Sequence, residues 1–112
     1  MPVTRVVFYR EADGSIPFIE WFASLPEKVQ DKCRTRIERL GSLGYELRRP
    51  EADYLEAGIL ELRASYQSIH YRVLYFFSGQ LTAVISHGLV KERGVPPEEI
   101  RNALRHKRNF ER

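Results

Sequence analysis

Alternation of hydrophobic and polar positions along the chain predicts four β-strands. They are residues 3–9, 59–66, 69–77 and 80–88. These segments are rich in the β-branched and aromatic residues that strands favour. Turn-forming residues separate the last three strands, at Gln67-Ser68 and at Ser78-Gly79. The last three strands are therefore expected to pair in antiparallel order.

Between the first two strands the hydrophobic period changes to three or four residues, which predicts helices. A first helix is expected from Ile16, and Ser24 and Glu27 have the spacing of a capping box that would start a second one. Gly41 and Gly44 would end the second helix. Its apolar stripe consists of Leu25, Val29, Cys33, Ile37 and Leu40.

The remaining segments complete a prediction of fold class. Residues 45–58 are rich in charge and read as an irregular connection, and a last helix is expected over residues 97–108. The order β-α-α-β-β-β-α predicts an α+β domain, with two long helices on one face of an antiparallel sheet. With 112 residues, the chain fits a single domain over residues 1–112.

The predicted turns also indicate which strand residues are neighbours, because opposed residues in an antiparallel pair share a face. A turn at Gln67-Ser68 places Arg63 opposite Arg72. A turn at Ser78-Gly79 places His70 opposite His87 and Arg72 opposite Ile85. The face opposite the helices would then form a basic concavity. Two adjacent arginines repel each other unless an anion or a carboxylate such as that of Glu61 lies between them.

Charge is unevenly distributed along the chain, whose net charge is +3. Residues 91–112 hold seven Lys or Arg against four Glu, and the rest of the chain balances. This excess favours a polyanionic partner such as a nucleic acid. An alternative is that the last helix simply complements its own dipole, with acidic residues in its first turn and basic residues in its last.

A hydrophobic fraction of 43% is typical of an ordinary globular protein, and the chain has a single cysteine. Cys33 excludes an internal disulfide, fits a reducing compartment and, within the helix stripe, is expected to be buried. No apolar run is long enough for a membrane helix, and the first residues lack a signal peptide's apolar stretch, so we expect a cytoplasmic protein. Three scattered histidines offer no metal-ligand spacing, and no cofactor is expected.

Three short motifs, taken in order, resemble a known family. They are E-L-R at Glu61–Arg63, Y-R-V-L-Y at Tyr71–Tyr75 and H-x-x-x-K-x-R at His87–Arg93, before a helix that starts with proline. Their order and spacing resemble those of the RelE/ParE superfamily of bacterial toxins, closest to the HigB-like, phage-derived branch. The resemblance runs from about Val3 to the last helix. It implies a RelE-like fold and a type II toxin that is neutralised by an antitoxin, expected to be a helix-turn-helix protein.

The resemblance also implies a reaction, the ribosome-dependent and metal-independent cleavage of messenger RNA. The 2′-hydroxyl of RNA can attack the neighbouring phosphorus if an enzyme orients it, stabilises the phosphoryl charge and moves two protons. In the family the arginine of Y-R-x-x-Y, here Arg72, grips the scissile phosphate. We expect Lys91 and Arg93 to assist it and His87 to exchange a proton. Further substrate contacts are expected from Arg63, His70, Arg105, Lys107 and Arg108.

Several of these residues have structural alternatives. Arg63 could anchor Glu61, His87 could be a hydrogen-bonded strand end, and Lys91 and Arg93 could belong to a solvated loop. The function has alternatives too. ParE-like members of the superfamily bind DNA gyrase and lack nuclease activity, and a non-toxic nucleic-acid-binding domain is a third possibility. The histidine and the basic loop favour RNA.

Overall fold

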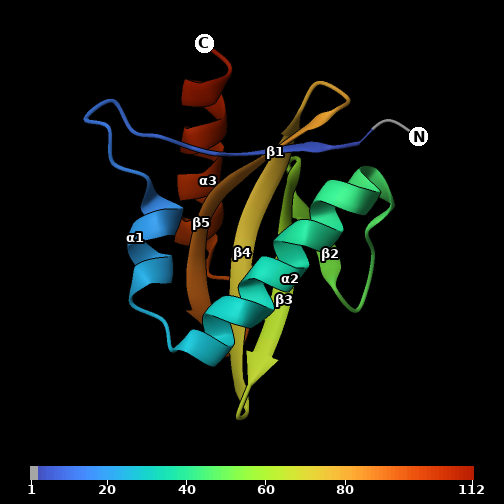
Figure 1. Ribbon diagram of the computed structural model, residues 1–112. Coiled ribbons are helices and arrows are strands. Elements are labelled where there is room, and N and C mark those ends of the chain that lie inside the picture. Colours follow the sequence, from blue (N-terminus) through green and yellow to red (C-terminus); the bar gives the residue numbers. More distant parts are fainter. Residues whose placement is uncertain (1–2) are drawn as a thin grey trace.

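The computed structural model describes residues 3–112, which form a five-stranded sheet with helices on both faces (Figure 1). The strands are β1 (Arg5–Phe8), β2 (Ala52–Glu56), β3 (Ile59–Tyr66), β4 (Ile69–Ser78) and β5 (Thr82–Lys91). The helices are α1 (Pro17–Ala23), α2 (Glu27–Leu43) and α3 (Pro97–Phe110), and a 3-10 helix, η1 (Gly44–Glu46), follows α2. The predicted α+β class is confirmed. No helix within residues 3–112 is both long and apolar enough to span a membrane.

The sheet is mixed, which corrects the prediction of an antiparallel sheet. Its strand order is β1-β5-β4-β3-β2, and β1 pairs in parallel with β5 while all other neighbours are antiparallel. Parallel pairing needs a long connection, and the chain between β1 and β5 supplies one. The edge strand β2 lies within the segment expected to be irregular. The sequence did not predict this strand because Tyr54 and Glu56 are exposed and only Ala52 within it is fully buried.

Helices α1 and α2 cover one face of the sheet and lie in front of it in Figure 1. Of these two helices only α2, with 17 residues, is long, whereas α1 spans seven residues. The predicted capping box is wrong: the Ser24 hydroxyl donates to the Trp21 carbonyl, and Pro26 takes the N-cap position of α2. Gly41 stays inside α2, while Gly44 ends it with a φ of 53° that favours glycine. As predicted, Cys33 is buried in the core on this side.

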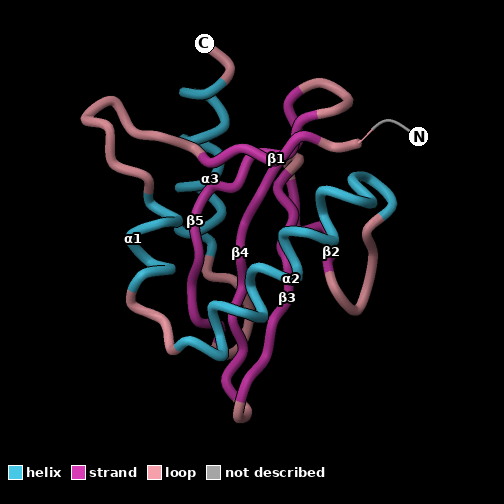
Figure 2. Tube along the Cα trace, viewed as in Figure 1, coloured by secondary structure: helices cyan, strands magenta, loops and turns pink. Residues whose placement is uncertain are grey.

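Helix α3 packs on the opposite face, which was predicted to form an uncovered basic concavity. A second apolar core lies there, formed by Tyr9, Ile59, Leu74, Phe76, Val84, Leu89, Ile100 and Ala103. The strand β4 is buried without interruption from residue 71 to residue 76, which is the pattern of a strand covered on both faces. Figure 2 shows α3 as a helix separate from the layer of α1 and α2.

The register of β3 on β4 is as predicted, with Arg63 opposite Arg72. The register of β4 on β5 differs, because a three-residue loop over 79–81 leaves Ser78 opposite Thr82. A bulge then leaves Ser86 without a partner, so His87 lies opposite Leu74, and His70 lies opposite Lys91. An odd shift in register exchanges the faces of a strand. Ile85 therefore belongs to the core on the α2 side, and the bulge returns His87 to the α3 side.

Candidate functional site

Three of the predicted site residues line one pocket at the side of the sheet, where β3 extends past its pairing with β2. We call this the basic pocket. It has a volume of about 570 Å³, and its lining residues are Asp31, Lys32, Thr35, Arg36, Pro50, Arg63, Ala64, Ser65, His70 and Arg72. Four of the lining side chains are Lys or Arg, and Asp31 is the one carboxylate among them. The pocket is therefore suited to an anionic ligand.

Glu61 lies between the two strand arginines of the basic pocket. Its Oε2 is 2.9 Å from Nε of Arg63, and its Oε1 is 3.2 Å from Nε of Arg72. The second contact is an ion pair without hydrogen-bond geometry. Both Glu61 and Arg72 are nearly inaccessible, at 2% and 6% exposure. The carboxylate thus offsets the repulsion that the register of β3 and β4 imposes, as the sequence indicated.

The charge pairing continues outward from Glu61 to the edge of the sheet. Arg63 Nη2 is 3.1 Å from Oδ2 of Asp53, and Arg49 Nη2 is 2.9 Å from the same oxygen. The hydrogen bond from Arg49 lowers the pKa of Asp53. Arginines and carboxylates therefore alternate across β2, β3 and β4. Such a network holds each guanidinium in one position, which is the arrangement a site needs to orient a phosphate.

His70 lies beside these arginines and is exposed. Its Nδ1 is 3.0 Å from the hydroxyl of Ser65, and its cross-strand partner is Lys91 at the end of β5. Lys91 is half-buried. Arg93 lies in the following loop, is exposed, and lines a different pocket with Val90. The structure thus places Lys91 next to His70 and leaves Arg93 outside the basic pocket.

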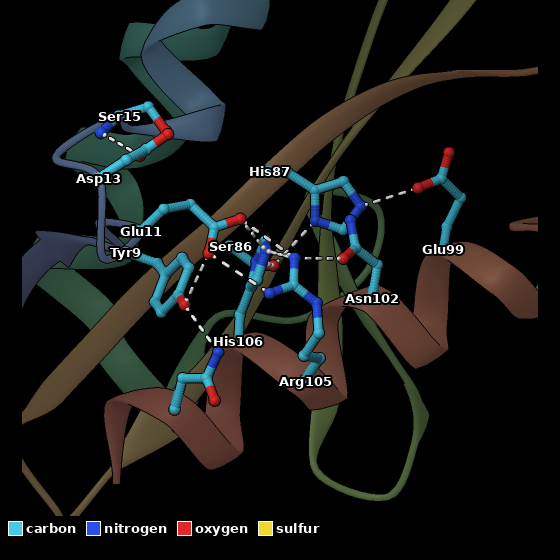
Figure 3. Close-up of polar contacts among 11 residues, drawn as sticks. Tyr9, Glu11, Asp13, Ser15, Ser86, His87, Glu99, Asn102, Arg105 and His106 are labelled. Atoms are coloured by element: carbon cyan, nitrogen blue, oxygen red, sulfur yellow. Dashed lines mark hydrogen bonds and ion pairs between the residues drawn. The ribbon is translucent and has the colours of Figure 1, made fainter. Parts of the chain in front are cut away.

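His87 lies elsewhere, in a buried polar cluster between β5 and α3 that also includes His106 (Figure 3). The hydroxyl of Ser86 is 2.8 Å from Nδ1 of His87 and 2.7 Å from Nδ1 of His106. Nε2 of His87 is 2.9 Å from Oε1 of Glu99, in the first turn of α3. Burial lowers the pKa of His87, and it lowers the pKa of His106 to about 4. Both imidazoles are therefore neutral at pH 7.

The hydrogen-bond partners determine which ring nitrogens carry protons. Ser86 has one hydroxyl hydrogen, so one of its two histidine neighbours must donate to it and the other must accept from it. Nε2 of His87 faces the Glu99 carboxylate and must be its donor, which leaves Nδ1 of His87 to accept from Ser86. His106 then donates from Nδ1, and its Nε2 accepts from Arg105 at 3.2 Å. We assign both tautomers on this basis. Each nitrogen of His87 is thus engaged within the protein.

Arg105 is also engaged within this cluster. Its Nη2 is 3.0 Å from Oε2 of Glu11, a residue of the loop after β1, and the hydrogen bond from Arg105 lowers the pKa of Glu11. The ring of Tyr9 stacks on His106 at 4.1 Å, and its hydroxyl donates to Glu11. Figure 3 shows these side chains converging from three segments that are distant in the sequence. The sequence contained no signal for this cluster, because no motif links its members.

The remaining predicted residues lie apart from the basic pocket. Lys107 lines a pocket beside the turn between β2 and β3, and Arg108 is exposed on α3. Conversely, Lys32 and Arg36 of α2 belong to the basic pocket, although the sequence did not single them out. The only indication of this position in the sequence is that both residues lie outside the apolar stripe of α2. Within residues 3–112, no group of three or more His, Cys, Asp or Glu side chains is arranged to hold a metal ion.

Comparison with known proteins identifies the family. The model of the family described as "Phage derived protein Gp49-like (DUF891)" matches residues 20–108, most of the chain. The protein belongs to the Gp49-like family. This family lies within the RelE/HigB-like toxin superfamily and is associated with toxins of toxin–antitoxin pairs, which implies an antitoxin as partner. No curated protein matches the chain significantly. The predicted superfamily is confirmed, while the HigB-like branch stays a prediction.

Proposed function

We propose that this Gp49-like protein is an endoribonuclease toxin of a type II toxin–antitoxin system that cleaves messenger RNA on the ribosome. The observation that carries the proposal is the pair Arg63 and Arg72, fixed by the buried Glu61 carboxylate beside an exposed imidazole in the basic pocket. Two guanidinium groups with fixed directions can bind the non-bridging oxygens of one phosphodiester. The family association with toxins supports the same function.

The proposed reaction is an attack within the RNA strand. The 2′-oxygen of one nucleotide forms a bond to the adjacent phosphorus, and the bond from phosphorus to the 5′-oxygen of the next nucleotide breaks. The 2′-hydroxyl loses its proton, and the leaving 5′-oxygen gains one, so the products end in a 2′,3′-cyclic phosphate and a 5′-hydroxyl. Arg72 and Arg63 stabilise the charge that accumulates on the phosphoryl oxygens. Lys32 and Arg36 bind neighbouring phosphates.

His70 is the histidine that we assign to proton transfer, in place of His87. It is exposed within the basic pocket, whereas both ring nitrogens of His87 are bonded to Ser86 and Glu99 beneath α3. A group that exchanges protons with a substrate must reach it directly or through one water molecule. Lys91, opposite His70, is positioned to contribute positive charge at the same end of the pocket.

Substitution of His70 tests this assignment. We expect His70→Gln to lower the single-turnover rate of messenger RNA cleavage about a hundredfold, because proton transfer by one positioned side chain contributes a factor of about that size. The rates are measured with purified protein, ribosomes and a defined messenger RNA. Gln67→Asn, in the turn that precedes β4 and outside the lining of the basic pocket, is the matched control and should cleave at the wild-type rate.

Two results would contradict the proposal at different levels. A His70→Gln protein that cleaves at the wild-type rate would remove His70 from proton transfer and leave phosphate binding by the arginines intact. Expression of the wild-type protein that damages DNA, with translation and messenger RNA unaffected, would favour the gyrase-binding alternative and contradict the nuclease assignment as a whole.

A further inference from the structure

A second pocket, on the other side of the Arg49–Asp53 ion pair, has the features of a binding site that the proposed reaction does not use. It has a volume of about 700 Å³ and lies between the segment 44–49, the hairpin of β2 and β3, and α3. Four aromatic residues, Tyr45, Tyr54, Tyr75 and Phe77, contribute to its lining. We call it the aromatic pocket. Its volume falls in the range of pockets that hold small molecules.

The two exposed rings of the aromatic pocket are held in position without a ligand. Tyr45 stacks on Phe77 with ring centroids 3.8 Å apart, and its hydroxyl donates to the carbonyl of Gly79. The hydroxyl of Tyr54 accepts a hydrogen bond from the backbone N–H of Gly58. Both rings are nevertheless half exposed, at 50% and 57%. Rings that are already ordered can stack on a planar ligand at little further entropic cost.

Tyr75 supplies a polar group that has no partner. Its side chain is fully buried, and its hydroxyl makes no hydrogen bond among the described residues. Burial raises the pKa of Tyr75, so the hydroxyl stays protonated and able to donate. Leaving a buried hydroxyl unpaired costs stability, and such groups in native proteins call for an explanation. A ligand with an acceptor atom would provide the missing partner.

The charge of the aromatic pocket favours an anionic ligand. Arg49 is paired with Asp53, which is the one carboxylate in the lining. Arg48 donates to the backbone carbonyls of Tyr45 and Leu47, and Lys107 approaches the turn at Gly58. Within the described part of the chain, neither Arg48 nor Lys107 forms an ion pair. These two cations therefore remain available for a phosphate.

We propose that the aromatic pocket binds a nucleobase together with its phosphate, with the base on the tyrosine rings and the phosphate at Arg48 and Lys107. An aromatic wall, an unpaired hydroxyl and uncompensated cations together match a nucleotide. The inference rests on the proposed function only in taking the RNA strand as the natural source. Asp53 lines the aromatic pocket and pairs with Arg63 of the basic pocket, so one strand can occupy both.

Calorimetric titration of the purified protein tests this inference without any measurement of cleavage. The probes are adenosine, AMP, inorganic phosphate and a short RNA made resistant to cleavage by 2′-O-methylation. We expect AMP to bind more tightly than adenosine or phosphate alone, and Tyr75→Phe to weaken its binding five- to tenfold through the loss of one hydrogen bond. Without ligand, Tyr75→Phe should melt at the same temperature as wild type or higher, because it removes an unpaired buried group.

Charge variants locate the phosphate. Lys107→Gln should weaken AMP binding about tenfold and adenosine binding much less, while Arg101→Gln, an exposed site on the same helix, should change neither. If AMP does not bind but the RNA does, and both Tyr75→Phe and Lys107→Gln weaken that binding, the pocket takes a nucleotide only as part of a strand.

The inference is overturned if neither AMP nor RNA binds, or if Tyr75→Phe and Lys107→Gln bind both as wild type does. These outcomes are independent of catalysis. A protein that fails to cleave messenger RNA could still bind AMP in this pocket, and a protein that cleaves it could leave the pocket empty.

Discussion

The Glu61 carboxylate explains how Arg63 and Arg72 can lie directly opposite each other on adjacent strands. Its carboxylate contacts both guanidinium groups, and Nη1 of Arg72 donates to the carbonyl of Tyr71. Nη2 of Arg72 and Nη1 of Arg63 have no hydrogen-bond partner among the described residues, so these two nitrogens are the ones left for a ligand of the basic pocket. This arrangement has a consequence for mutagenesis. Arg72 is 6% exposed, and removing it would leave the charge of Glu61 buried with Arg63 as its remaining partner. Loss of function in such a variant would therefore mix chemistry with stability.

We expect Arg72→Ala to lower the free energy of unfolding by about 3 kcal/mol, because one partner of a buried ion pair is lost. Urea denaturation followed by circular dichroism measures the change. Arg101→Ala, at an exposed site on α3, is the control and should alter stability by less than about 0.5 kcal/mol. If Arg72→Ala and wild type have equal free energies of unfolding, the ion pair between Arg72 and Glu61 does not stabilise the fold.

At the scale of elements, α3 is held to β5 by polar contacts as well as by its apolar stripe. Arg105, His106, Ser86, His87 and Glu99 form one chain of hydrogen bonds that leaves α3, crosses β5 and returns to α3. The bulge in β5 makes this possible, because it lets Ser86 and His87 face the same helix. The attachment of α3 therefore requires neutral histidines.

This requirement predicts a pH dependence of stability. His106 has a pKa of about 4 in the folded protein, whereas the unfolded chain takes up its proton below about pH 6.5. The unfolded state thus binds more protons between these values, and the free energy of unfolding should fall by about 2 kcal/mol from pH 7 to pH 5 on account of His106. The lowered pKa of His87 adds a change in the same direction.

Urea denaturation at pH 7, 6 and 5 measures this dependence. His106→Gln should be less stable than wild type at pH 7, and the difference should shrink as the pH falls, because the variant lacks the titrating group. Glu11 titrates below this range, since its pKa is lowered by Arg105. A constant difference across the three pH values would mean that His106 does not titrate as its burial requires.

The strands and helices with a strong hydrophobic period could be predicted from the sequence, and the others could not. The bounds of β3 match the prediction, and those of β4 and α3 differ from it by only a few residues. The edge strand β2 was missed because exposed residues interrupt its pattern. The side on which α3 packs was also missed, since β4 is apolar on both faces and periodicity alone does not assign a helix to either.

Only the part of the candidate site that follows from the hairpin turn between β3 and β4 could be predicted from the sequence. The pairing of Arg63 with Arg72 follows from the short hairpin between β3 and β4, and the role of Glu61 follows from that pairing. The position of His87 depends instead on a three-residue loop and a bulge, neither of which the sequence specifies strongly. The contributions of α2 to the basic pocket depend on how a helix lies across the sheet, which only the folded chain shows.

For the whole molecule, one face of the sheet carries both the β5–α3 cluster and the Glu61–Arg72 ion pair, because Glu61 and His87 both lie opposite Leu74 of β4. The β5–α3 cluster holds α3 against the sheet through hydrogen bonds. The segment that precedes β2 contributes to both pockets, with residues 44–49 in the aromatic pocket and Pro50 in the basic pocket. Both pockets therefore depend on residues 44–56, the part of the chain with the weakest sequence signal. An RNA strand that crosses this segment would meet cations in both pockets, which agrees with the proposed substrate, a single-stranded messenger RNA.

Single-turnover cleavage of messenger RNA on ribosomes by Arg72→Lys tests most directly whether the Arg72 guanidinium binds the scissile phosphate. Lysine retains the charge that pairs with Glu61, so the variant should stay folded, but it lacks the planar fork that binds two phosphoryl oxygens. We predict that wild-type protein produces 2′,3′-cyclic phosphate ends and that Arg72→Lys does so ten- to a hundredfold more slowly. Arg101→Lys is the control. A folded Arg72→Lys protein that cleaves at the wild-type rate would contradict phosphate binding by the Arg72 guanidinium, and a wild-type protein that produces no such ends would contradict the proposed nuclease reaction.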